Sequence, residues 1–498
     1  MLLLKFDEKS RKPKYQQILE QIRQKIETRV LRPGEKLPST RRLADKLGIH
    51  RSTVSIAYQE LWALGFIDLR PGSCPRVRKR KQVVQAVNRT EKTVIDWEVA
   101  ASEESSTILQ TYLSFHSGTN RKNGSSLINF RSLDMDRRLF PLETFRSCLN
   151  RAIKEQGIAL LGYGDCAGFP PLREYIARRL QKHGISVTPE EILITNGSQH
   201  GIDLVFRMIA SPGKTVVIES PTYDYMPPLL RFSGLRPIEV PVGHGGMDLS
   251  ILEETIQKEH PVLIYTMPNF HNPTGISTGQ AHRERLLSLS EMHRIPILED
   301  GFEEEMKYFG KVVLPIKSMD RHHLVIYCGT FSKVLFPGLR IGWIAAAREC
   351  IERLTAIRRY SEVSPGMILQ AGIDEFCREG FYDRHISRMH RVFRKRMHAA
   401  IHALNRHISP EWAQWTEPNG GYLIWLKLKP VSSPSLDWKN LFASHGVEIT
   451  PGKYFFYSEN PGTYLRLSIS TLNEEEIAEG VQRLSKALDH VYSQNRRL

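Results

Sequence analysis

Apolar residues in the first eighty positions recur with helical spacing and predict three short helices. The first predicted helix has its apolar face at five positions, Tyr15, Ile18, Leu19, Ile22 and Ile26. A second helix is predicted to begin after Ser39, whose hydroxyl suits an N-cap, and a third near Ser52, beyond the break at Gly48. Two short helices joined by a tight turn that contains glycine are typical of a helix-turn-helix. The alternating residues 66–77 then predict a β-hairpin, the wing of a winged helix.

From about residue 128 the pattern changes to short apolar runs separated by helical patterns. Five such runs have the length of buried strands: residues 192–194, 215–218, 262–265, 295–298 and 324–327. Each ends in a loop with Gly, Pro or Asp, which is typical of a mostly parallel α/β sheet with its chemistry at the strand ends. The polar residues 81–126 predict a linker with some local helix around residues 105–115. The predicted domains are therefore 1–80 and 127–498, on either side of this linker.

Length and composition are those of a soluble globular protein. The 498 residues suffice for two or three domains, and 41% of them are hydrophobic and 25% charged. No apolar run approaches the roughly 20 residues that span a bilayer, and the apolar start is too short for a signal peptide, so we expect a cytoplasmic protein without membrane contact. The six cysteines form no CxxC pair, which predicts reduced thiols and no metal site. The net charge of +15 favours a polyanionic partner such as nucleic acid.

The stretch from Gly329 to Trp343 carries the most informative chemical pattern. Lys333 follows the hydroxyl residues Thr330 and Ser332 and precedes Arg340, in a segment bent by Gly and Pro and without flanking acids. Pyridoxal 5'-phosphate (PLP) needs a lysine for its Schiff base, anion-binding groups for its phosphate and a carboxylate for its pyridinium nitrogen. The layout suits Lys333 as the Schiff-base lysine, with the two hydroxyls and the arginine at the phosphate.

The amino-terminal pattern resembles the winged helix-turn-helix of GntR-type bacterial regulators over residues 15–77. The matching positions are, in order, Pro33-Gly34, Leu37-Pro38-Ser39, Arg41, Leu43-Ala44, Leu47-Gly48, Arg51, Thr53-Val54, Ala57-Tyr58, Leu61 and Gly65-Phe66-Ile67. The resemblance implies double-stranded promoter DNA as a partner, contacted by Arg41, Arg51, Ser52 and Gly72. The start of the recognition helix also offers Arg51, Ser52 and Thr53 to a major groove, where arginine can bind guanine O6 and N7.

Residues from about 128 to 490 resemble the fold-type I aminotransferases, so the whole chain resembles the MocR-type regulators, in which a winged helix is fused to such a domain. The matching motifs are Asn129–Ser132 with Leu139–Pro141, Leu161–Asp165, Thr195–Gln199, Pro221–Tyr223, Asn272–Gly275, Ile297–Asp300 and Tyr464–Ser468. The resemblance implies an α/β domain with a mostly parallel central sheet, PLP as cofactor, and a homodimer with sites shared across a two-fold interface.

The resemblance also implies roles for individual residues. At the phosphate it places Tyr163 of the other subunit and the amides of Ser198 and Gln199, which start a helix. Around the ring it places Tyr223 on the pyridine face, Asn272 at the phenolic oxygen and Asp300 at the pyridine nitrogen. Arg466 would bind the carboxylate of an amino ligand, although an arginine in an apolar run can also serve as a structural ion-pair partner.

Phe302 departs from the MocR pattern, which usually has a tyrosine two residues after the aspartate. Without that phenol the acid–base properties of the Lys333 nitrogen are less well tuned, so we expect the cofactor to bind without efficient turnover. The favoured hypothesis is a DNA-binding regulator that senses PLP or an amino compound. The alternative is an active aminotransferase with an appended DNA-binding domain. A third option, a scaffold without cofactor, is disfavoured because Asp300, Lys333, Arg340 and Arg466 are all present.

Two further features have ordinary structural interpretations. The arginines at positions 388, 391, 394 and 396 are predicted to form a solvated helix face. His271, next to Asn272, is predicted to pack or face solvent rather than to act as an acid or base.

Overall fold

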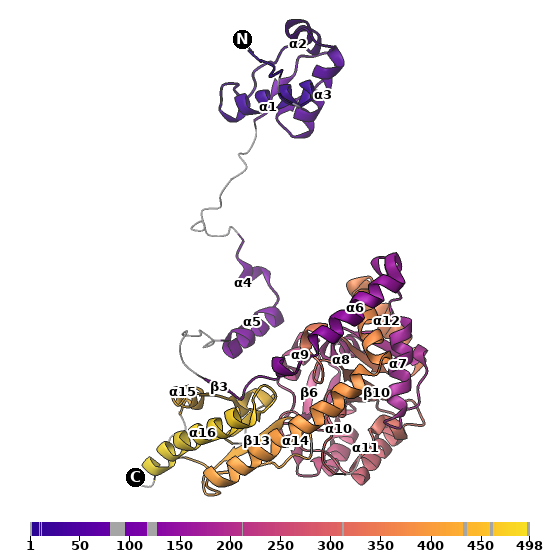
Figure 1. The fold of residues 1–498 in the computed structure, drawn as a ribbon, viewed down its shortest axis with the longest axis vertical. Coiled ribbons are helices and arrows are strands. Elements are labelled where there is room, and N and C mark those ends of the chain that lie inside the picture. Colours follow the sequence, from indigo (N-terminus) through magenta and orange to yellow (C-terminus); the bar gives the residue numbers. More distant parts are fainter. Residues whose placement is uncertain are drawn as a thin grey trace. The chain divides into compact units, whose positions relative to one another are not determined.

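The computed structural model describes residues 2–8, 10, 12–79, 95–116, 127–211, 213–310, 313–431, 436–458 and 462–495. The chain divides into two compact units, residues 1–100 and 101–498 (Figure 1). The linker predicted at residues 81–126 lies outside the described residues at 81–94 and 117–126. Its predicted local helix is present as α5 (Glu103–His116), which contacts α9 (Met226–Phe232) in the second unit.

The first unit contains the three predicted helices and the predicted hairpin. Its elements are α1 (Lys14–Glu27), α2 (Thr40–Leu47), α3 (Arg51–Ala63), β1 (Ile67–Asp68), β2 (Arg76–Val77) and α4 (Trp97–Ala100). The N-cap at Ser39 is confirmed, because its hydroxyl accepts a hydrogen bond of 3.3 Å from the amide of Arg42. The helix ends at Gly48, which adopts the left-handed conformation with φ +61°. A core that includes Ile18, Val54 and Tyr58 joins the helices to the hairpin.

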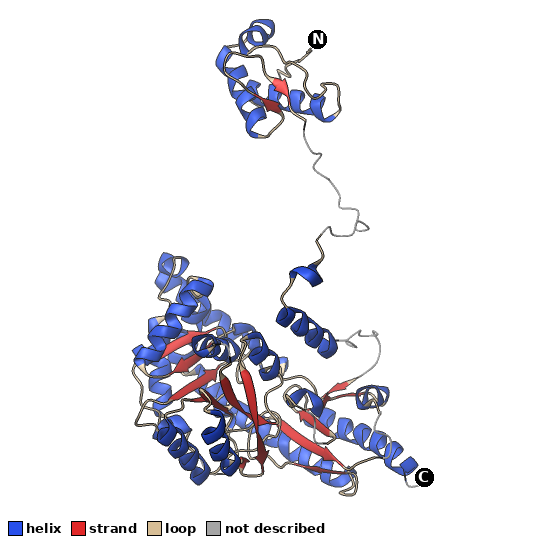
Figure 2. Cartoon of the chain, turned by 180° about the vertical axis from the view of Figure 1, so that it is seen from behind, coloured by secondary structure: helices blue, strands red, loops and turns tan. Residues whose placement is uncertain are grey.

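An eight-stranded sheet forms the centre of the second unit, as the apolar runs predict (Figure 2). In spatial order its strands are β4 (Ile192–Thr195), β11 (Gly342–Ala345), β10 (Val325–Thr330), β9 (Ile297–Asp300), β8 (Leu263–Thr266), β5 (Thr215–Ser220), β6 (Arg236–Gly243) and β7 (Gly246–Met247). The pairs from β10 through β6 are parallel, whereas β11 is antiparallel to both neighbours. The prediction of a mostly parallel α/β sheet is confirmed.

Helices cover both faces of this sheet, which explains why its strands are apolar throughout. Adjacent residues of β4 show the arrangement, since Ile192 and Ile194 join one core cluster and Leu193 joins another. One face packs against α7 (Pro170–Gln181), α10 (Leu249–Glu259), α11 (Gln280–His293), α13 (Met367–Arg378) and α14 (Phe381–His407). The other face packs against α8 (Ser198–Ile209), α9 and α12 (Arg348–Glu362).

A smaller antiparallel sheet follows in the carboxyl-terminal part of the chain. Its strands, in spatial order, are β12 (Ala413–Trp415), β13 (Leu423–Leu428), β16 (Tyr464–Ser468) and β15 (Thr450–Pro451). Beside it, β3 (Ile128–Asn129) pairs in parallel with β14 (Val447–Glu448). The remaining helices of the unit are α6 (Leu142–Gln156), α15 (Trp438–Ser444) and α16 (Glu474–Asn495). The pair β3–β14 therefore joins the start of the second unit to its carboxyl-terminal part.

The prediction of a solvated arginine face on α14 is wrong at Arg396. Arg388, Arg391 and Arg394 are exposed, but Arg396 is only 3% exposed. Its guanidinium lies 2.5 Å from the carboxylate of Asp136 and donates to the carbonyl of Ser470. A buried arginine needs such partners, and they come from segments far away in the sequence. No helix among the described residues has both the length and the apolar character needed to cross a membrane.

Candidate functional site

The carboxyl edge of the large sheet collects most of the predicted site residues. Asp300 is the last residue of β9, Lys333 follows β10, Asn272 follows β8 and Tyr223 follows β5. This edge is where parallel α/β sheets bind their ligands. Arg466 comes from β16 of the smaller sheet and joins the same cluster through Asn272.

Asp300 is held by a residue that the sequence analysis did not identify. The hydroxyl of Tyr265, a buried residue of β8, donates a 2.9 Å hydrogen bond to Oδ2 of Asp300. The other carboxylate oxygen, Oδ1, is buried without a hydrogen-bond partner among the described residues. Burial raises the pKa of Asp300 to about 7, although the bond from Tyr265 lowers it. A tyrosine in an otherwise apolar parallel strand is the signal that could have indicated this contact, because its hydroxyl needs a buried partner.

Lys333 lies at the same edge, one strand away from Asp300. Its Nζ donates to the carbonyl of Leu133 over 3.3 Å. Burial lowers the pKa of Lys333, and the nearby Glu303 and Asp134 oppose this shift. A lowered pKa leaves more of the amine neutral, which is the form that attacks a carbonyl carbon.

The predicted phosphate residues belong to the start of α8 and to the end of β10 with the segment that follows it. Ser198 is the first residue of this helix and Gln199 the second. Thr330 donates to the carbonyl of Ile341 over 3.2 Å, while the buried Oγ of Ser332 has no hydrogen-bond partner among the described residues. Arg340 is exposed and reaches the carbonyl of Asn196 with Nη2 at 2.8 Å. The guanidinium of Arg340 lies close to the start of α8, since an added Cβ at Gly197 would come within 2.7 Å of its Nη2. Helix amides and a guanidinium together suit a phosphate dianion.

Arg466 is almost completely buried, with its side chain 2% exposed. Its Nη1 donates to Oδ1 of Asn272 over 3.1 Å, and its Nη2 donates to the carbonyl of Arg131 and to Thr450. The ring of Phe455 lies 4.9 Å from the guanidinium carbon. The structure thus brings Arg466 and Asn272 together, as one site requires.

The aromatic residues of the prediction occupy different settings. Tyr223 stacks on Tyr225, with ring centroids 5.5 Å apart, beside Asp224 and Arg466. Tyr163 is 87% exposed, so within its own chain it is not part of the cluster. Phe302 is buried and packs in the core cluster that contains Leu298 and Cys328. His271 is buried as well, bonded to Thr274 over 2.8 Å, which confirms the prediction that it packs.

Two acids in this cluster were missed by the sequence analysis. Glu303 is fully buried, and neither of its carboxylate oxygens has a hydrogen-bond partner of ordinary geometry among the described residues. Burial raises the pKa of Glu303 to about 8, against the influence of Tyr422, Lys333 and Arg466. The Asp224 side chain is 3% exposed and lies 3.9 Å from Nη1 of Arg466. In the sequence, Glu303 lies in an acidic run and Asp224 lies between two tyrosines. Neither position indicates that the side chain is near Lys333 or Arg466.

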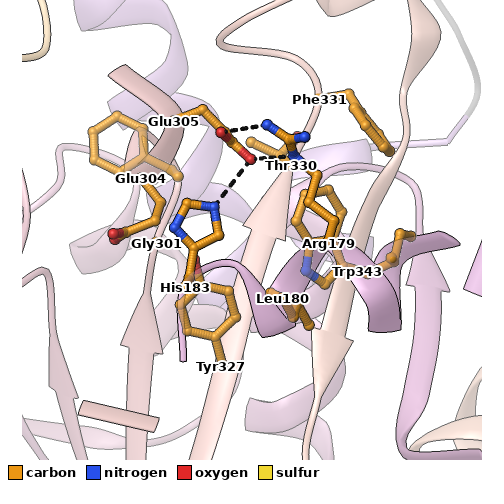
Figure 3. A pocket seen from close by; sticks show the side chains of 12 residues that line it. Arg179, Leu180, His183, Gly301, Glu304, Glu305, Tyr327, Thr330, Phe331 and Trp343 are labelled. Atoms are coloured by element: carbon orange, nitrogen blue, oxygen red, sulfur yellow. Dashed lines mark hydrogen bonds and ion pairs between the residues drawn. The ribbon is translucent and has the colours of Figure 1, made fainter. Parts of the chain in front are cut away.

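An ion network anchors the segment that carries Glu303 (Figure 3). Glu305 binds Arg179 of α7 through two contacts of 2.5 and 2.7 Å and lies 3.3 Å from His183. Although burial opposes it, hydrogen bonds from His183 and Arg179 lower the pKa of Glu305 to about 2. Arg179 also contacts Asp383 and lies over the ring of Tyr382. The network lines a small pocket with Phe302 and Thr330, and it fixes the turn that follows Asp300.

The predicted DNA-contact residues lie on the surface of the first unit. Arg41, Arg51 and Ser52 are exposed at the starts of α2 and α3, and Thr53 is half-buried. Arg51 donates to the hydroxyl of Thr40 over 3.3 Å, which joins the two helix starts. Gly72 adopts φ +75° in the turn between β1 and β2. The residues that the resemblance assigns to DNA therefore share the helix-turn-helix and its hairpin.

Comparison with known proteins decides the family. The model of the family described as "aminotransferase class I and II" matches residues 133–484. The model of the family described as "bacterial regulatory proteins, gntR family" matches residues 14–77. The uncharacterized HTH-type transcriptional regulator YdfD of Bacillus subtilis is 30% identical over 97% of both chains. MocR of Rhizobium meliloti is 27% identical over 97% of this chain and 96% of its own. The chain belongs to the MocR-type subfamily of GntR regulators.

The aminotransferase-like part of this MocR-type chain has the fold of solved fold-type I enzymes. LysN, the α-aminoadipate aminotransferase of Thermus thermophilus, was solved with N-(5'-phosphopyridoxyl)-L-leucine. It superimposes with a TM-score of 0.72 at 33% identity, covering 80% of this chain and all of LysN. Members of this aminotransferase family bind PLP.

The residues of the MocR-type chain fit the same cofactor. The unpartnered Oδ1 of Asp300 is what a protonated pyridine nitrogen would satisfy, and the buried hydroxyl of Ser332 has no hydrogen-bond partner among the described residues. Lys333 supplies an amine at the same edge of the sheet. The donor set therefore matches the three requirements of PLP: a carboxylate, an anion cradle and a lysine.

Proposed function

We propose that this MocR-type protein is a DNA-binding transcriptional regulator that holds PLP through Lys333 and responds to PLP or to an amino compound. The observation that carries the proposal is the buried, unpartnered Oδ1 of Asp300 at the strand edge that also bears Lys333. A buried carboxylate oxygen without a partner is costly, and a protonated ring nitrogen would remove that cost.

In this proposal each residue has a defined task. Asp300, oriented by Tyr265, would hold the ring nitrogen of PLP in its protonated form, and the start of α8 with Thr330, Ser332 and Arg340 would hold the phosphate. Asn272 would bind the phenolic oxygen and Tyr223 would cover the ring face. When bound, PLP supplies a carbonyl carbon that forms a C=N bond with an amine.

An amino ligand would compete with the amine of Lys333 for the carbonyl carbon that bound PLP supplies. Arg466 would take the carboxylate of the ligand. Only a difference in ligand affinity between two arrangements of the protein can drive a switch in DNA binding. The amine of Lys333 is therefore the group through which an amino ligand would act on DNA binding in this proposal.

A homodimer completes the proposal. Tyr163 is 87% exposed and lies outside the cluster of its own chain, as expected of a residue that serves the partner's phosphate. Two winged helices in one dimer would bind paired half-sites through Arg41, Arg51, Ser52, Thr53 and Gly72.

An aminotransferase with an appended DNA-binding domain remains the second candidate. The contact between Arg466 and Asn272 favours it, because it joins a carboxylate-binding group to the cofactor site. Phe302 argues against it, since the ring packs in the core and offers no hydroxyl. Repeated amino-group transfer to a keto acid would establish the enzyme over the sensor.

Two variants test the proposal on the full-length protein. Lys333→Ala should abolish the visible absorbance band of the bound cofactor and the response of DNA binding to amines. Arg51→Ala should weaken specific DNA binding by about 1–3 kcal/mol and leave the absorbance unchanged. Wild-type protein that stays colourless with excess PLP would refute the cofactor assignment, and unaltered DNA affinity in Arg51→Ala would refute the recognition helix.

A further inference from the structure

One face of α14 is basic along almost the whole helix, which is the long orange helix beside α16 in Figure 1. Its exposed side chains are spaced three or four residues apart, as positions on one side of a helix are. At 3.6 residues per turn they share an arc of about 80°, and every position of that arc is Arg, Lys or His. We call these residues the basic stripe: Arg384, Arg388, Arg391, Lys395, His398, His402 and Arg406.

Carboxylates of the chain do not neutralise the basic stripe. Exposed arginines of other helices have acidic partners; Arg348 of α12, for example, pairs with Glu352 one turn further on. The single acid of α14, Asp383, is bound to Arg179 and Lys182 instead. In the described part of the chain, none of the ion pairs involves the basic stripe. Its positive charge is therefore available to a partner.

The opposite face of α14 is fixed in the core. Nε2 of His385 lies 2.8 Å from the carbonyl oxygen of Val334, and the guanidinium of Arg396 lies 2.5 Å from the carboxylate of Asp136. Phe393 packs in the largest core cluster. A helix held in this way keeps the spacing of its exposed cations, so binding to a rigid partner requires little ordering of the backbone.

The length and the charge of the basic stripe suit the backbone of duplex DNA. At 1.5 Å per residue the stripe extends over about 33 Å, close to the roughly 34 Å of one turn of B-DNA. Duplex DNA carries a negative charge about every 1.7 Å along its axis, so a row of cations meets phosphates over its whole length. Contacts of arginine and lysine with phosphate position DNA without reading its sequence.

A membrane surface is another large polyanion, but the basic stripe does not suit it. Helices that bind lipid surfaces carry apolar side chains such as Trp, Phe or Leu, which enter the acyl boundary. The exposed positions of α14 have polar side chains only. Residues 14–77 of the same chain match the gntR family of regulators, so DNA is the polyanion that the rest of the molecule indicates.

We propose that α14 is a second DNA-binding surface of this chain, at which the basic stripe binds the phosphate backbone of duplex DNA. This inference goes beyond the proposed function, in which only the winged helix-turn-helix contacts DNA. The aminotransferase-like unit then contributes affinity that is independent of sequence, while the winged helix-turn-helix contributes specificity.

The test measures binding of the PLP-loaded full-length protein to a random-sequence duplex several helical turns long, at increasing salt. Arg388→Gln, Arg391→Gln and Lys395→Gln are combined in one stripe variant, because glutamine removes the charge and keeps a high helix propensity. Each lost phosphate contact lowers the slope of log affinity against log salt by about 0.9, so the slope should fall by about 2.7. At low salt the affinity should fall at least about tenfold. An unchanged slope would overturn the inference.

A matched control variant removes the same charge from arginines that have acidic partners, and its slope should equal that of wild type. The control combines Arg236→Gln, Arg285→Gln and Arg348→Gln, whose partners are Glu259, Glu253 and Glu352. Equal losses in the stripe variant and the control would mean that net charge is the cause, and would overturn the inference. If the stripe variant unfolds at a lower temperature than wild type, Arg391→Gln alone, with an expected loss of about 0.9 in slope, decides the same question.

The comparison with Arg51→Ala separates this inference from the proposed function. Arg51→Ala should reduce the preference for promoter over random DNA, whereas the stripe variant should weaken binding to both duplexes by the same factor. An unaffected stripe variant beside an impaired Arg51→Ala would refute the second surface alone. Wild-type protein that binds neither duplex would refute both.

Phosphatidylserine vesicles test the alternative partner. We expect the wild-type protein to bind these vesicles no better than the stripe variant does. If the stripe variant lost binding to vesicles and kept its binding to DNA, the basic stripe would be a membrane-binding surface and the inference would be overturned.

Discussion

Three carboxylates converge beside Lys333, and burial changes the acidity of each. Asp300 and Glu303 have pKa values raised by burial to about 7 and about 8, and burial also raises the pKa of Asp224, against the influence of Arg466. Removal from water disfavours the charged form of an acid, so without ligands Asp300 and Glu303 hold their protons to a higher pH than free carboxyl groups do. Ligand cations, from the cofactor ring or from an amine, would favour their ionisation. The carboxylates that would bind ligand cations are thus the groups that make the cofactor-free protein less stable at high pH.

This acidity predicts a pH dependence of stability in the cofactor-free protein. Between about pH 4.5 and 8 the folded protein keeps a proton on Glu303 that the unfolded chain releases, so this contribution to stability is lost as the pH rises to about 8. Glu303→Gln removes the effect. At pH 8 the variant should unfold at a temperature roughly 2–4 °C higher than wild type, with little difference at pH 5. Scanning calorimetry at both values measures this.

A surface variant serves as the control for this pH dependence. Glu254→Gln, on the exposed side of α10, should unfold as wild type does at both pH values. If the wild-type protein became more stable relative to the Glu303→Gln variant between pH 5 and pH 8, this result would contradict the raised pKa of Glu303.

Sequence motifs predict Lys333 and Asp300 as site residues but give no indication of the side chains around them. Lys333 has no acidic neighbours along the chain, yet Glu303 and Asp224 act on it in space because three strands end at one edge of the sheet. Tyr265 was overlooked for the same reason, since its partner Asp300 comes from the adjacent strand. Local patterns specify a residue's own type and place, while its partners depend on how the strands are ordered.

At the scale of elements, the start of α8 is fixed by its contact with β11. Gly342, the first residue of β11, approaches so closely that an added Cβ would lie 2.7 Å from the carbonyl carbon of Gly197 and 2.8 Å from the amide nitrogen of Ser198. The carbonyl oxygen of Gly329 would lie at 2.8 Å as well. All three are backbone atoms, which cannot turn away as a side chain can. The glycine therefore sets the position of the amides that would bind phosphate.

Gly342→Ala should weaken PLP binding by displacing these amides. We expect an increase in Kd of at least about tenfold, equivalent to about 1.4 kcal/mol, because helix-terminal anion binding depends on amide direction. Titration of the cofactor-free protein with PLP, followed by absorbance, gives the Kd. Gly338→Ala in the same loop is the control, since its added Cβ would meet no atom within 4 Å. Equal losses in the two variants would mean that the contact with α8 is not the cause.

Secondary structure was predicted better than the pairing of elements. The helices of the first unit and the five runs of the large sheet occur where the apolar periodicity predicts them, within a few residues. The buried pair of Arg396 and Asp136 was missed because α14 has 27 residues and its polar positions look alike in sequence. Which of them face the interior depends on a segment some 260 positions earlier.

At the scale of the whole molecule, several apolar residues in the segment before Tyr163 and at the end of α12 are exposed. Ile158 is 86% exposed, Leu161 73% and Tyr360 95%. The loop that carries Tyr163 is fastened to the residues after α12 by a 3.0 Å hydrogen bond from the amide of Gly164 to Ser364. Apolar side chains gathered on a rigid surface are typical of a subunit interface. The proposed homodimer would cover them and carry Tyr163 to the partner's site.

Ile158→Asp should therefore separate the subunits and weaken both proposed activities together. A buried, unpaired carboxylate at an interface is costly, so the mass in solution should fall from twice the chain mass towards 57.2 kDa. Sedimentation measures this directly. PLP affinity should drop because Tyr163 no longer reaches a second site, and DNA affinity should drop because two half-sites are no longer bound at once. Ile251→Asp, on α10 and 39% exposed, should change none of these properties. A variant that becomes monomeric while keeping its PLP affinity would show that each site is complete within one chain.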